Sequence, residues 1–360
     1  MSGEPPFHID GIPVEIGNIE KALAKIWETA EENKSRASHI NLVIYTDDRT
    51  TIAATNQIIA TLAGEHACRV ILVLAEPHRA TLPPQAWICA HCHLAGKGDI
   101  QKCSEQITFH LQGATALGIS SLVFSHLESD LPLVLWWQPP LPSSVDSNIW
   151  SWVDRIIFDS ATWNNPANGV NFIQEIANCR ENGLIAPKRA MLCDLNWTRL
   201  MGARMALAAI FDHSAAMAEL TKLAHLHLTH GAKSRITSFL FLGWIAAQLR
   251  WQIASPSSRN TFIDTTGRQI TFQVEEIPEE SCFISCTLAS PSATFRIEKE
   301  KGADHFQLSM EGIHCSKFFQ TVCAESSDVT DILLIELGRN GIHPNYFEAL
   351  EIISPFLLAE

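Results

Sequence analysis

Apolar residues along the first half of the chain gather in short runs that are separated by segments with helical spacing. The runs that predict buried strands are residues 41–46, 69–75, 133–137, 155–158 and 190–193. A helix is expected between the first two runs and ends near Gly64. Strand, helix and strand in this order predict parallel strands with right-handed crossovers. We therefore expect an α/β fold with a largely parallel sheet flanked by helices.

The pattern changes after residues 255–259, whose serines and proline indicate a linker. Beyond it the runs alternate or are rich in β-forming residues, at 271–274, 282–288, 294–298 and 305–310. We expect an N-terminal α/β domain over 1–165 and a C-terminal domain over 166–360. The second domain is predicted to be helical or α/β to about 255, then β-rich with a terminal helix, so this β-rich part is the smaller one.

Composition narrows the classes of function. The chain has 360 residues, of which 46% are hydrophobic and 18% charged, and its formal net charge is −13. An acidic chain argues against binding to nucleic acid or to an anionic membrane, because phosphates attract lysine and arginine. The N-terminus lacks a signal peptide pattern, and no apolar run is long enough to span a bilayer. We expect a cytoplasmic protein whose ten cysteines are mostly thiols.

Motifs for nucleotide binding and for covalent catalysis are absent from the sequence. No Gly-x-Gly-x-x-Gly follows a strand, and no Gly-x-x-x-x-Gly-Lys-Ser/Thr or Gly-x-Ser-x-Gly appears. We expect no cofactor and no catalytic residue of these kinds.

Three aspartates, Asp47, Asp159 and Asp194, each follow a predicted parallel strand. Ligands of open α/β sheets bind beyond the carboxyl ends of the strands, so these carboxylates could form an acid–base or metal site. Arg199 and Arg204 on the following helix could pair with Asp194 or bind an anion. The alternatives are helix capping by the aspartates and ordinary ion pairs of the arginines.

Cysteines and histidines cluster near residue 90. Cys89, Cys92, His93 and Cys103 supply ligand types that zinc prefers. His91 could serve in place of His93. On a strand, however, Cys89, His91 and His93 share a face while Cys92 points away. The alternative is therefore a set of buried thiols and surface imidazoles.

Trp136 and Trp137 end an apolar strand, so their side chains point to opposite faces. One is expected in the core and the other at the surface, where tryptophan is enriched at interface hot spots. The alternative places both in the core.

Several segments, in order, resemble the glucose-6-phosphate dehydrogenase assembly protein (OpcA) family. They are Cys103-Ser-Glu-Gln-Ile-Thr108, Asp130-Leu-Pro-Leu-Val-Leu-Trp-Trp137, Arg155-Ile-Ile-Phe-Asp-Ser160, Asp194-Leu-Asn-Trp-Thr-Arg-Leu200, Phe241-Leu-Gly-Trp-Ile245 and Pro344-Asn-Tyr-Phe-Glu-Ala-Leu350. The chain departs from the family pattern at Ser104, at Met201-Gly-Ala203 and at His343. The resemblance implies a non-catalytic assembly factor and allosteric activator of glucose-6-phosphate dehydrogenase, at the entry to the oxidative pentose phosphate pathway.

The resemblance also directs attention to particular side chains. Those expected to bind the partner or an effector are Trp136, Trp137, Asp159, Asp194, Trp197, Arg199 and Arg204. The family's link to redox control points to Cys282, Cys286, Cys315 and Cys323 as candidate thiols. Cys282 and Cys286 are too far apart on an extended strand to bridge, and Cys315 and Cys323 need a turn between them. The alternative function is a protein or enzyme that binds a sugar phosphate or another anion.

Overall fold

The structure, a computed structural model, describes residues 9–28, 34–36, 38–94, 101–142, 152–181, 191–254, 260–278, 283–300, 302–312, 315–324, 326, 328–339, 341 and 343–358. They form two compact units, each built from several segments of the chain. The first comprises Met1–Phe158, Phe172–Cys193 and Leu333–Gly341, and the second comprises Asp159–Asn171, Asp194–Ile332 and Ile342–Glu360. The chain passes between the units at residues 158–159 and again at residues 171–172, on either side of residue 165. The domain boundary expected from the sequence at residue 165 stays a prediction.

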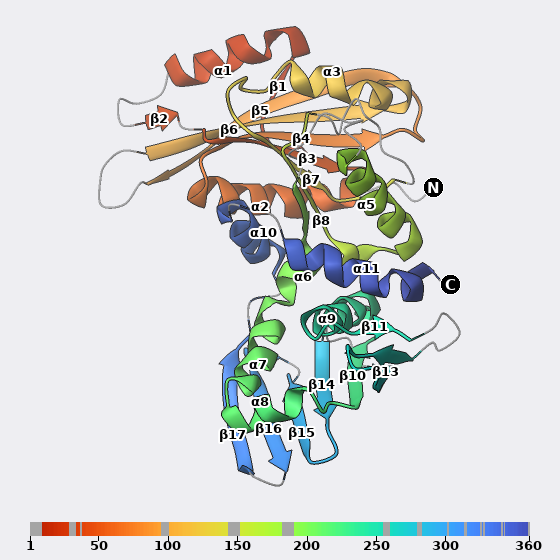
Figure 1. The fold of residues 1–360 in the computed structure, drawn as a ribbon. Helices are drawn as coiled ribbons and strands as arrows, with labels where there is room; N and C mark the ends of the chain where they lie inside the picture. Colours follow the sequence, from red (N-terminus) through yellow and green to blue (C-terminus); the bar gives the residue numbers. More distant parts are fainter. Residues whose placement is uncertain are drawn as a thin grey trace. The chain divides into compact units, whose positions relative to one another are not determined.

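The first unit is a nine-stranded sheet with helices on both faces (Figure 1). Its strands are β1 (Ile12–Val14), β2 (Lys34–Arg36), β3 (Ile40–Thr46), β4 (Cys68–Glu76), β5 (Leu82–Leu94), β6 (Gln101–Gln112), β7 (Leu133–Trp137), β8 (Arg155–Phe158) and β9 (Met191–Asp194). Its helical segments are η1 (Ile16–Asn18), α1 (Ile19–Glu28), η2 (Arg49–Thr51), α2 (Ile52–Glu65), η3 (Gly113–Gly118) and α3 (Ile119–Phe124). Two further helices, α5 (Pro166–Glu181) and α10 (Val329–Gly338), contribute residues to both units.

Strand order defines the topology of this sheet. Within the order β6-β4-β3-β7-β8-β9, the chain starts at β3 and adds β4 and then β6 on one side of it. It then crosses to the other side of β3 and adds β7, β8 and β9 in turn. This is the strand order of doubly wound dinucleotide-binding sheets. The pairs β6/β4, β4/β3, β3/β7 and β7/β8 are parallel, whereas β1/β5 and β5/β6 are antiparallel. All nine residues of β4 are buried, as expected for a strand covered on both faces. The prediction of a largely parallel α/β sheet is confirmed.

The second unit holds an eight-stranded, mostly antiparallel sheet in the order β11-β12-β13-β10-β14-β15-β16-β17. The strands are β10 (His225–Gly231), β11 (Gln252–Ile253), β12 (Thr261–Ile263), β13 (Gln269–Ile277), β14 (Phe283–Ala289), β15 (Ala293–Glu298), β16 (His305–Gly312) and β17 (Cys315–Cys323). The helical segments are η4 (Ser160–Thr162), α6 (Leu195–Arg199), α7 (Met201–Phe211), α8 (Ser214–Leu220), α9 (Arg235–Gln248) and α11 (Pro344–Leu358).

One face of this second sheet carries its core. Buried and more exposed residues alternate along β13 and β16, which puts every second side chain on the buried face. Helix α7 contacts β15, β16 and β17, and α9 contacts β10 and β13 (Figure 1). Strand β10 precedes residue 255 but lies between β13 and β14, with a parallel pairing to β13. No helix among the described segments is long and apolar enough to cross a bilayer.

Candidate functional site

Asp159 and Arg199 form an ion pair in the second unit. Asp159 follows β8 and accepts a hydrogen bond from the amide of Ala161, so it caps η4. Arg199, at the end of α6, donates two hydrogen bonds to the Asp159 carboxylate, at 3.2 and 2.8 Å. Both side chains are largely buried. A two-pronged arginine–carboxylate contact is strong and geometrically specific, so the positive charge of Arg199 is already matched.

Asp194 lies beside this pair and is almost completely buried, with 1% of its surface exposed. Its Oδ1 atom accepts hydrogen bonds from the backbone amides of Ser160 and Asn196, at 2.9 and 3.0 Å. Its Oδ2 atom is buried with no hydrogen-bond partner among the described residues. Burial, followed by the charge of Asp159, raises the pKa of Asp194 to about 7. A neutral carboxyl group at this position is a consequence of desolvation and of like charge.

Further hydrogen bonds join this pair of aspartates to α9. Asn196 donates to the hydroxyl of Ser160 at 3.0 Å and accepts from the hydroxyl of Thr237 at 2.8 Å. We call Asp159, Ser160, Asp194, Asn196 and Arg199 the aspartate cluster. It fixes the starts of η4 and α6 against each other and against α9. The capping alternative for Asp159 and Asp194 is thereby confirmed.

Trp197 and Arg204 belong to a neighbouring aromatic contact. The guanidinium of Arg204 lies 3.9 Å from the centre of the Trp197 ring, a cation–π geometry. Trp197 is 3% exposed, and its ring meets that of Tyr346 edge to face at 5.5 Å. Of the residues expected to surround an anion in this unit, Asp159, Asp194 and Arg199 come together, whereas Arg204 faces an aromatic ring. Asp47 belongs to the first unit.

The carboxyl edge of the first sheet is the place where doubly wound folds bind ligands. Here Asp48 accepts a hydrogen bond from the amide of Thr50 at 2.8 Å, ahead of α2. Gln138, directly after β7, donates to the hydroxyl of Thr55 at 3.0 Å. Burial, and after it the charge of Asp48, raise the pKa of the adjacent Asp47. At this edge Gln138 thus joins the end of β7 to α2, and Asp48 bonds to the backbone ahead of α2.

Glu76 ends β4 on the same edge and is held by a ring of donors. Arg49 donates to both carboxylate oxygens at 3.0 and 2.8 Å. The Nε atom of Arg79 lies 2.8 Å from the Oε1 atom of Glu76. His110 contacts the carboxylate at 2.7 Å, and Gln112 donates to it at 3.1 Å. Burial opposes ionisation, but the hydrogen bonds from Arg49, His110 and Gln112 outweigh it and lower the pKa of Glu76 to about 2. Glu76 was not expected as a site residue, because its only signal in the sequence is an acid at the end of an apolar run.

Trp136 and Trp137 differ in burial as alternation on a strand requires. Trp136 is 5% exposed, whereas Trp137 is half-buried and stacks on Tyr45 of β3, with ring centres 4.1 Å apart. The indole of Trp137 donates to the carbonyl of Pro140 at 3.2 Å. Trp137 is therefore the one of the pair that reaches the surface.

The zinc hypothesis for the β5–β6 hairpin is wrong. Cys92 and Cys103 face each other in the antiparallel register and form a disulfide, with Cα atoms 4.1 Å apart. Neither is then available as a thiolate. Cys89 remains a thiol whose burial raises its pKa to about 11. The ring of His93 packs close to Gly64 of α2.

Removing this disulfide is expected to destabilise the protein. Closing a loop of 11 residues lowers the conformational entropy of the unfolded chain. This stabilises the folded state by about 2–3 kcal/mol. The double variant Cys92→Ser/Cys103→Ser should lose this amount from the free energy of unfolding, measured with denaturant under non-reducing conditions. Cys89→Ser is the matched control on the same strand. Reductant should lower the wild type to the level of the double variant, and a wild type indifferent to reductant would contradict the bond.

The C-terminal thiols do not form the pairs considered from the sequence. Cys282 lies outside the described residues. Cys286 is buried in β14, where desolvation raises its pKa. Cys315 and Cys323 are the two ends of the continuous strand β17, about 26 Å apart at the rise of an extended strand. The turn that their pairing requires is therefore not present.

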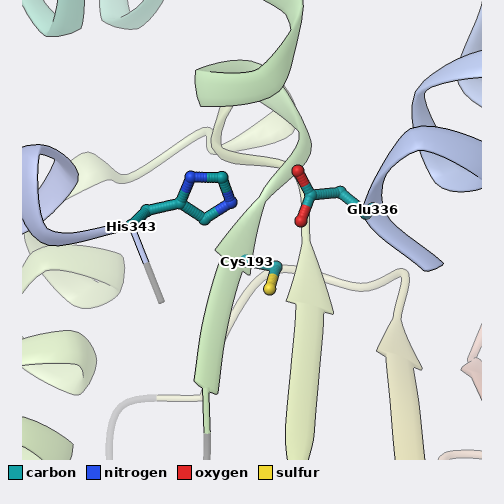
Figure 2. Close-up of side chains that lie close together, drawn as sticks. All are labelled: Cys193, Glu336 and His343. Carbon is teal, nitrogen blue, oxygen red and sulfur yellow. The ribbon is translucent and has the colours of Figure 1, made fainter. Parts of the chain in front are cut away.

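A thiol–carboxylate pair in the first unit was not expected. Figure 2 shows Cys193 on β9 and Glu336 on α10, while the third labelled residue, His343, belongs to the second unit. Burial, and then the charge of Glu336, raise the pKa of Cys193. Arg155 donates to the backbone carbonyls of Glu336 and Arg339. No sequence signal joins residues so far apart along the chain.

Comparison with protein families gives two matches. Residues 60–175 match a family described as the N-terminal domain of a glucose-6-phosphate dehydrogenase subunit. Residues 190–350 match a second family, described as the C-terminal domain of the same kind of subunit. The two matches cover most of the described residues of both units.

Curated relatives carry the name OxPP cycle protein OpcA. Those of Synechocystis sp. and Nostoc punctiforme are each 25% identical, over 66% and 54% of this chain and 48% and 42% of the relative. That of Synechococcus elongatus is 25% identical over 62% of this chain and 48% of the relative. The matched part of the chain spans about half the length of these relatives.

Among solved structures, an aldose-aldose oxidoreductase from Caulobacter crescentus is 10% identical with a TM-score of 0.45, covering 89% of this chain and 96% of that chain. A levoglucosan dehydrogenase is 9% identical with a TM-score of 0.41, covering 90% of each chain. These similarities concern the fold alone.

Proposed function

This chain belongs to the OpcA family of glucose-6-phosphate dehydrogenase assembly proteins, and from this premise we propose that it binds glucose-6-phosphate dehydrogenase and raises its activity without a catalytic step of its own. The setting is the oxidative pentose phosphate pathway in the cytoplasm. The observation that carries the non-catalytic part is the carboxyl edge of the first sheet.

That edge has the topology of a dinucleotide site but not its chemistry. In such sites, glycines before the first helix let the backbone approach a pyrophosphate, and an acid at the end of the second strand binds the ribose. Here Asp48 lies ahead of α2, where a dinucleotide site would hold the pyrophosphate. Its negative charge would repel phosphate. Glu76 stands at the ribose position and is engaged by Arg49, His110 and Gln112. A nicotinamide dinucleotide would have to displace these internal bonds.

The alternative, a sugar-phosphate or other anion site, has less support from the aspartate cluster. Arg199 is bound by Asp159, and Asp194 is buried with its pKa raised to about 7. An incoming anion would have to compete with a carboxylate that is already in place.

Activation follows from unequal binding. A protein that binds the active form or oligomer of the dehydrogenase more tightly than the inactive form shifts the population toward the active form. Couplings of this kind typically amount to about 5–150-fold. The acidic charge of −13 favours a partner surface with complementary basic residues.

The test mixes the protein with the dehydrogenase purified from the same organism. Initial rates are recorded against glucose 6-phosphate at rising concentrations of the protein, with and without reductant. We expect a saturating fall in KM or rise in kcat, together with co-elution of the two proteins. A dependence on reductant would involve the Cys92–Cys103 bond, the disulfide among the described residues. Unchanged rates without co-elution would overturn the proposal, and dinucleotide binding to the isolated protein would overturn its non-catalytic part.

A further inference from the structure

The second unit contains an apolar pocket that the aspartate cluster does not involve. It lies between α7, α8, α9 and β14 and has a volume of about 240 Å³. Its walls are mainly Leu207, Phe211, Leu220, Trp244 and Leu288. Apolar cavities of about 150 Å³ in proteins bind a benzene ring, so this pocket has room for an aromatic side chain.

Exposed side chains line the pocket or lie one helical turn from residues that line it. Ala208 and Gln248 line the pocket and are exposed. Met205 lies one helical turn before Ala208 on α7 and is 59% exposed, and Met217 lies one turn before Leu220 on α8 and is 54% exposed. Exposed methionines beside a pocket are typical of surfaces that adapt to a protein partner. A small metabolite inside the pocket would leave both methionines uncovered, so their exposure favours a polypeptide as the occupant.

The charge beside the pocket indicates the chemistry of that polypeptide. Asp212 directly follows Phe211 of the pocket wall, is exposed and forms the C-cap of α7. A carboxylate there adds to the negative end of the helix, which is an unfavourable place for an acid. Asp212 has no ion-pair or hydrogen-bond partner for its side chain within the described part of the chain. The nearby Glu219 is already bound by Lys222, Ser290 and Ser292. Asp212 is therefore an exposed negative charge next to the pocket wall that could bind a cation of a partner.

We infer that this pocket receives an aromatic or leucine side chain of the partner, from a segment that places lysine or arginine next to that anchor. The identity of the partner rests on the proposed function, in which the segment belongs to glucose-6-phosphate dehydrogenase. The anchor fills the space against Trp244 and Leu288, the flanking chain covers Met205 and Met217, and the basic residue meets Asp212. Buried anchors of this kind carry most of the energy of a protein interface.

The test compares Ala208→Trp, which fills the mouth from an exposed position, with Ala218→Trp, the same change at an exposed position on the opposite side of α8 from Leu220. Affinity for the dehydrogenase is measured by titration calorimetry. We expect Ala208→Trp to weaken binding by about tenfold or more and Ala218→Trp to leave it unchanged. Asp212→Lys should weaken binding and reduce its salt dependence, whereas Asp130→Lys, an equal charge change on the first unit, should do less.

A separate titration with indole, followed by NMR, examines the pocket without the partner. Indole should bind the wild type and Ala218→Trp but not Ala208→Trp. Equal dehydrogenase affinity for both tryptophan variants would overturn the inference and leave the proposed function standing. If the wild type does not bind the dehydrogenase, the proposed function fails and the choice of partner fails with it. Absence of indole binding would overturn the pocket as a receptor for an aromatic anchor.

Discussion

Replacing Asp194 with asparagine is expected to stabilise the protein at pH 8 and to leave its stability almost unchanged at pH 4. The carboxyl is buried, and its pKa is raised from 3.8 to about 7. Between these values the unfolded chain carries the charge while the folded chain must hold the proton. The free energy of unfolding therefore falls as pH rises from about 4 to 7, by ~1.4 kcal/mol per unit, and levels off above pH 7.

Asparagine keeps the side-chain oxygen that accepts hydrogen bonds from Ser160 and Asn196 but has no charge to lose. The substitution removes the free-energy cost of keeping the buried carboxyl protonated. Over about three pH units this cost reaches at most ~4 kcal/mol. The measurement is urea unfolding of both proteins at pH 4, 5.5, 7 and 8. The difference in unfolding free energy should grow with pH up to about 7.

Asp264→Asn is the matched control, because the pKa of Asp264 is shifted in the opposite direction and its replacement should change stability with the opposite sign. Hydrogen bonds led by that from Thr266 lower the pKa of Asp264 to about 2. A lowered pKa contributes stability above the ordinary pKa of 3.8, and this stability is lost as pH falls toward 2. Asp264→Asn should therefore reduce stability at neutral pH and lose its effect in acid. If Asp194→Asn and the wild type have the same pH profile, the carboxyl is not held protonated by the fold.

The sequence predicted the α/β architecture well because its strands and helices carry strong apolar patterns. The run at β4 is apolar enough to be buried on both faces, and the alternation in β13 and β16 marks one buried face. Parallel order follows from the alternation of strand and helix. These features depend on neighbours along the chain, so a single sequence contains them.

The β5–β6 hairpin shows where this reasoning fails. Strand β6 begins at Gln101, but its first residues are mostly polar, so the apolar pattern that predicts a buried strand is missing there. From Ser104 on, the polar residues of β6 are buried. Glu105 accepts a hydrogen bond from Trp27 and lies 3.3 Å from Arg69, and Gln106 bonds to His91 at 2.7 Å. Without an apolar pattern that marks a strand at Cys103, its register opposite Cys92 cannot be predicted from the sequence.

The aspartate cluster was predicted in part for a similar reason. Spacing along a helix suggested that Arg199 would meet Asp194, yet its partner is Asp159, which follows the preceding strand. Capping by aspartates after strands is a local preference and could be expected. Partners that come from another strand, such as Asp159 with Arg199 or Glu76 with His110, depend on strand order, which local spacing does not contain.

Replacing Arg199 with methionine is expected to cost about 3–5 kcal/mol of unfolding free energy, the range observed when one member of a buried pair is removed. Methionine keeps much of the apolar stem but leaves the largely buried Asp159 carboxylate without its two hydrogen bonds, at 3.2 and 2.8 Å. Arg268→Met is the control, since Arg268 pairs with Asp264 within one turn and is more exposed. An exposed pair of that type contributes little to stability, so Arg268→Met should cost much less than Arg199→Met.

The double variant Asp159→Asn/Arg199→Met separates charge from packing. With no buried carboxylate left unpaired, it should recover a large part of the stability that Arg199→Met loses, so the two substitutions should be strongly non-additive. Denaturant unfolding of the four proteins in the cycle, at a pH well above the ordinary pKa of aspartate, measures this coupling. Additive losses would mean that Arg199 acts through packing alone. Because Asp159 caps the start of η4 and Arg199 ends α6, a coupled result would also make the ion pair a contact that holds these two helical segments together.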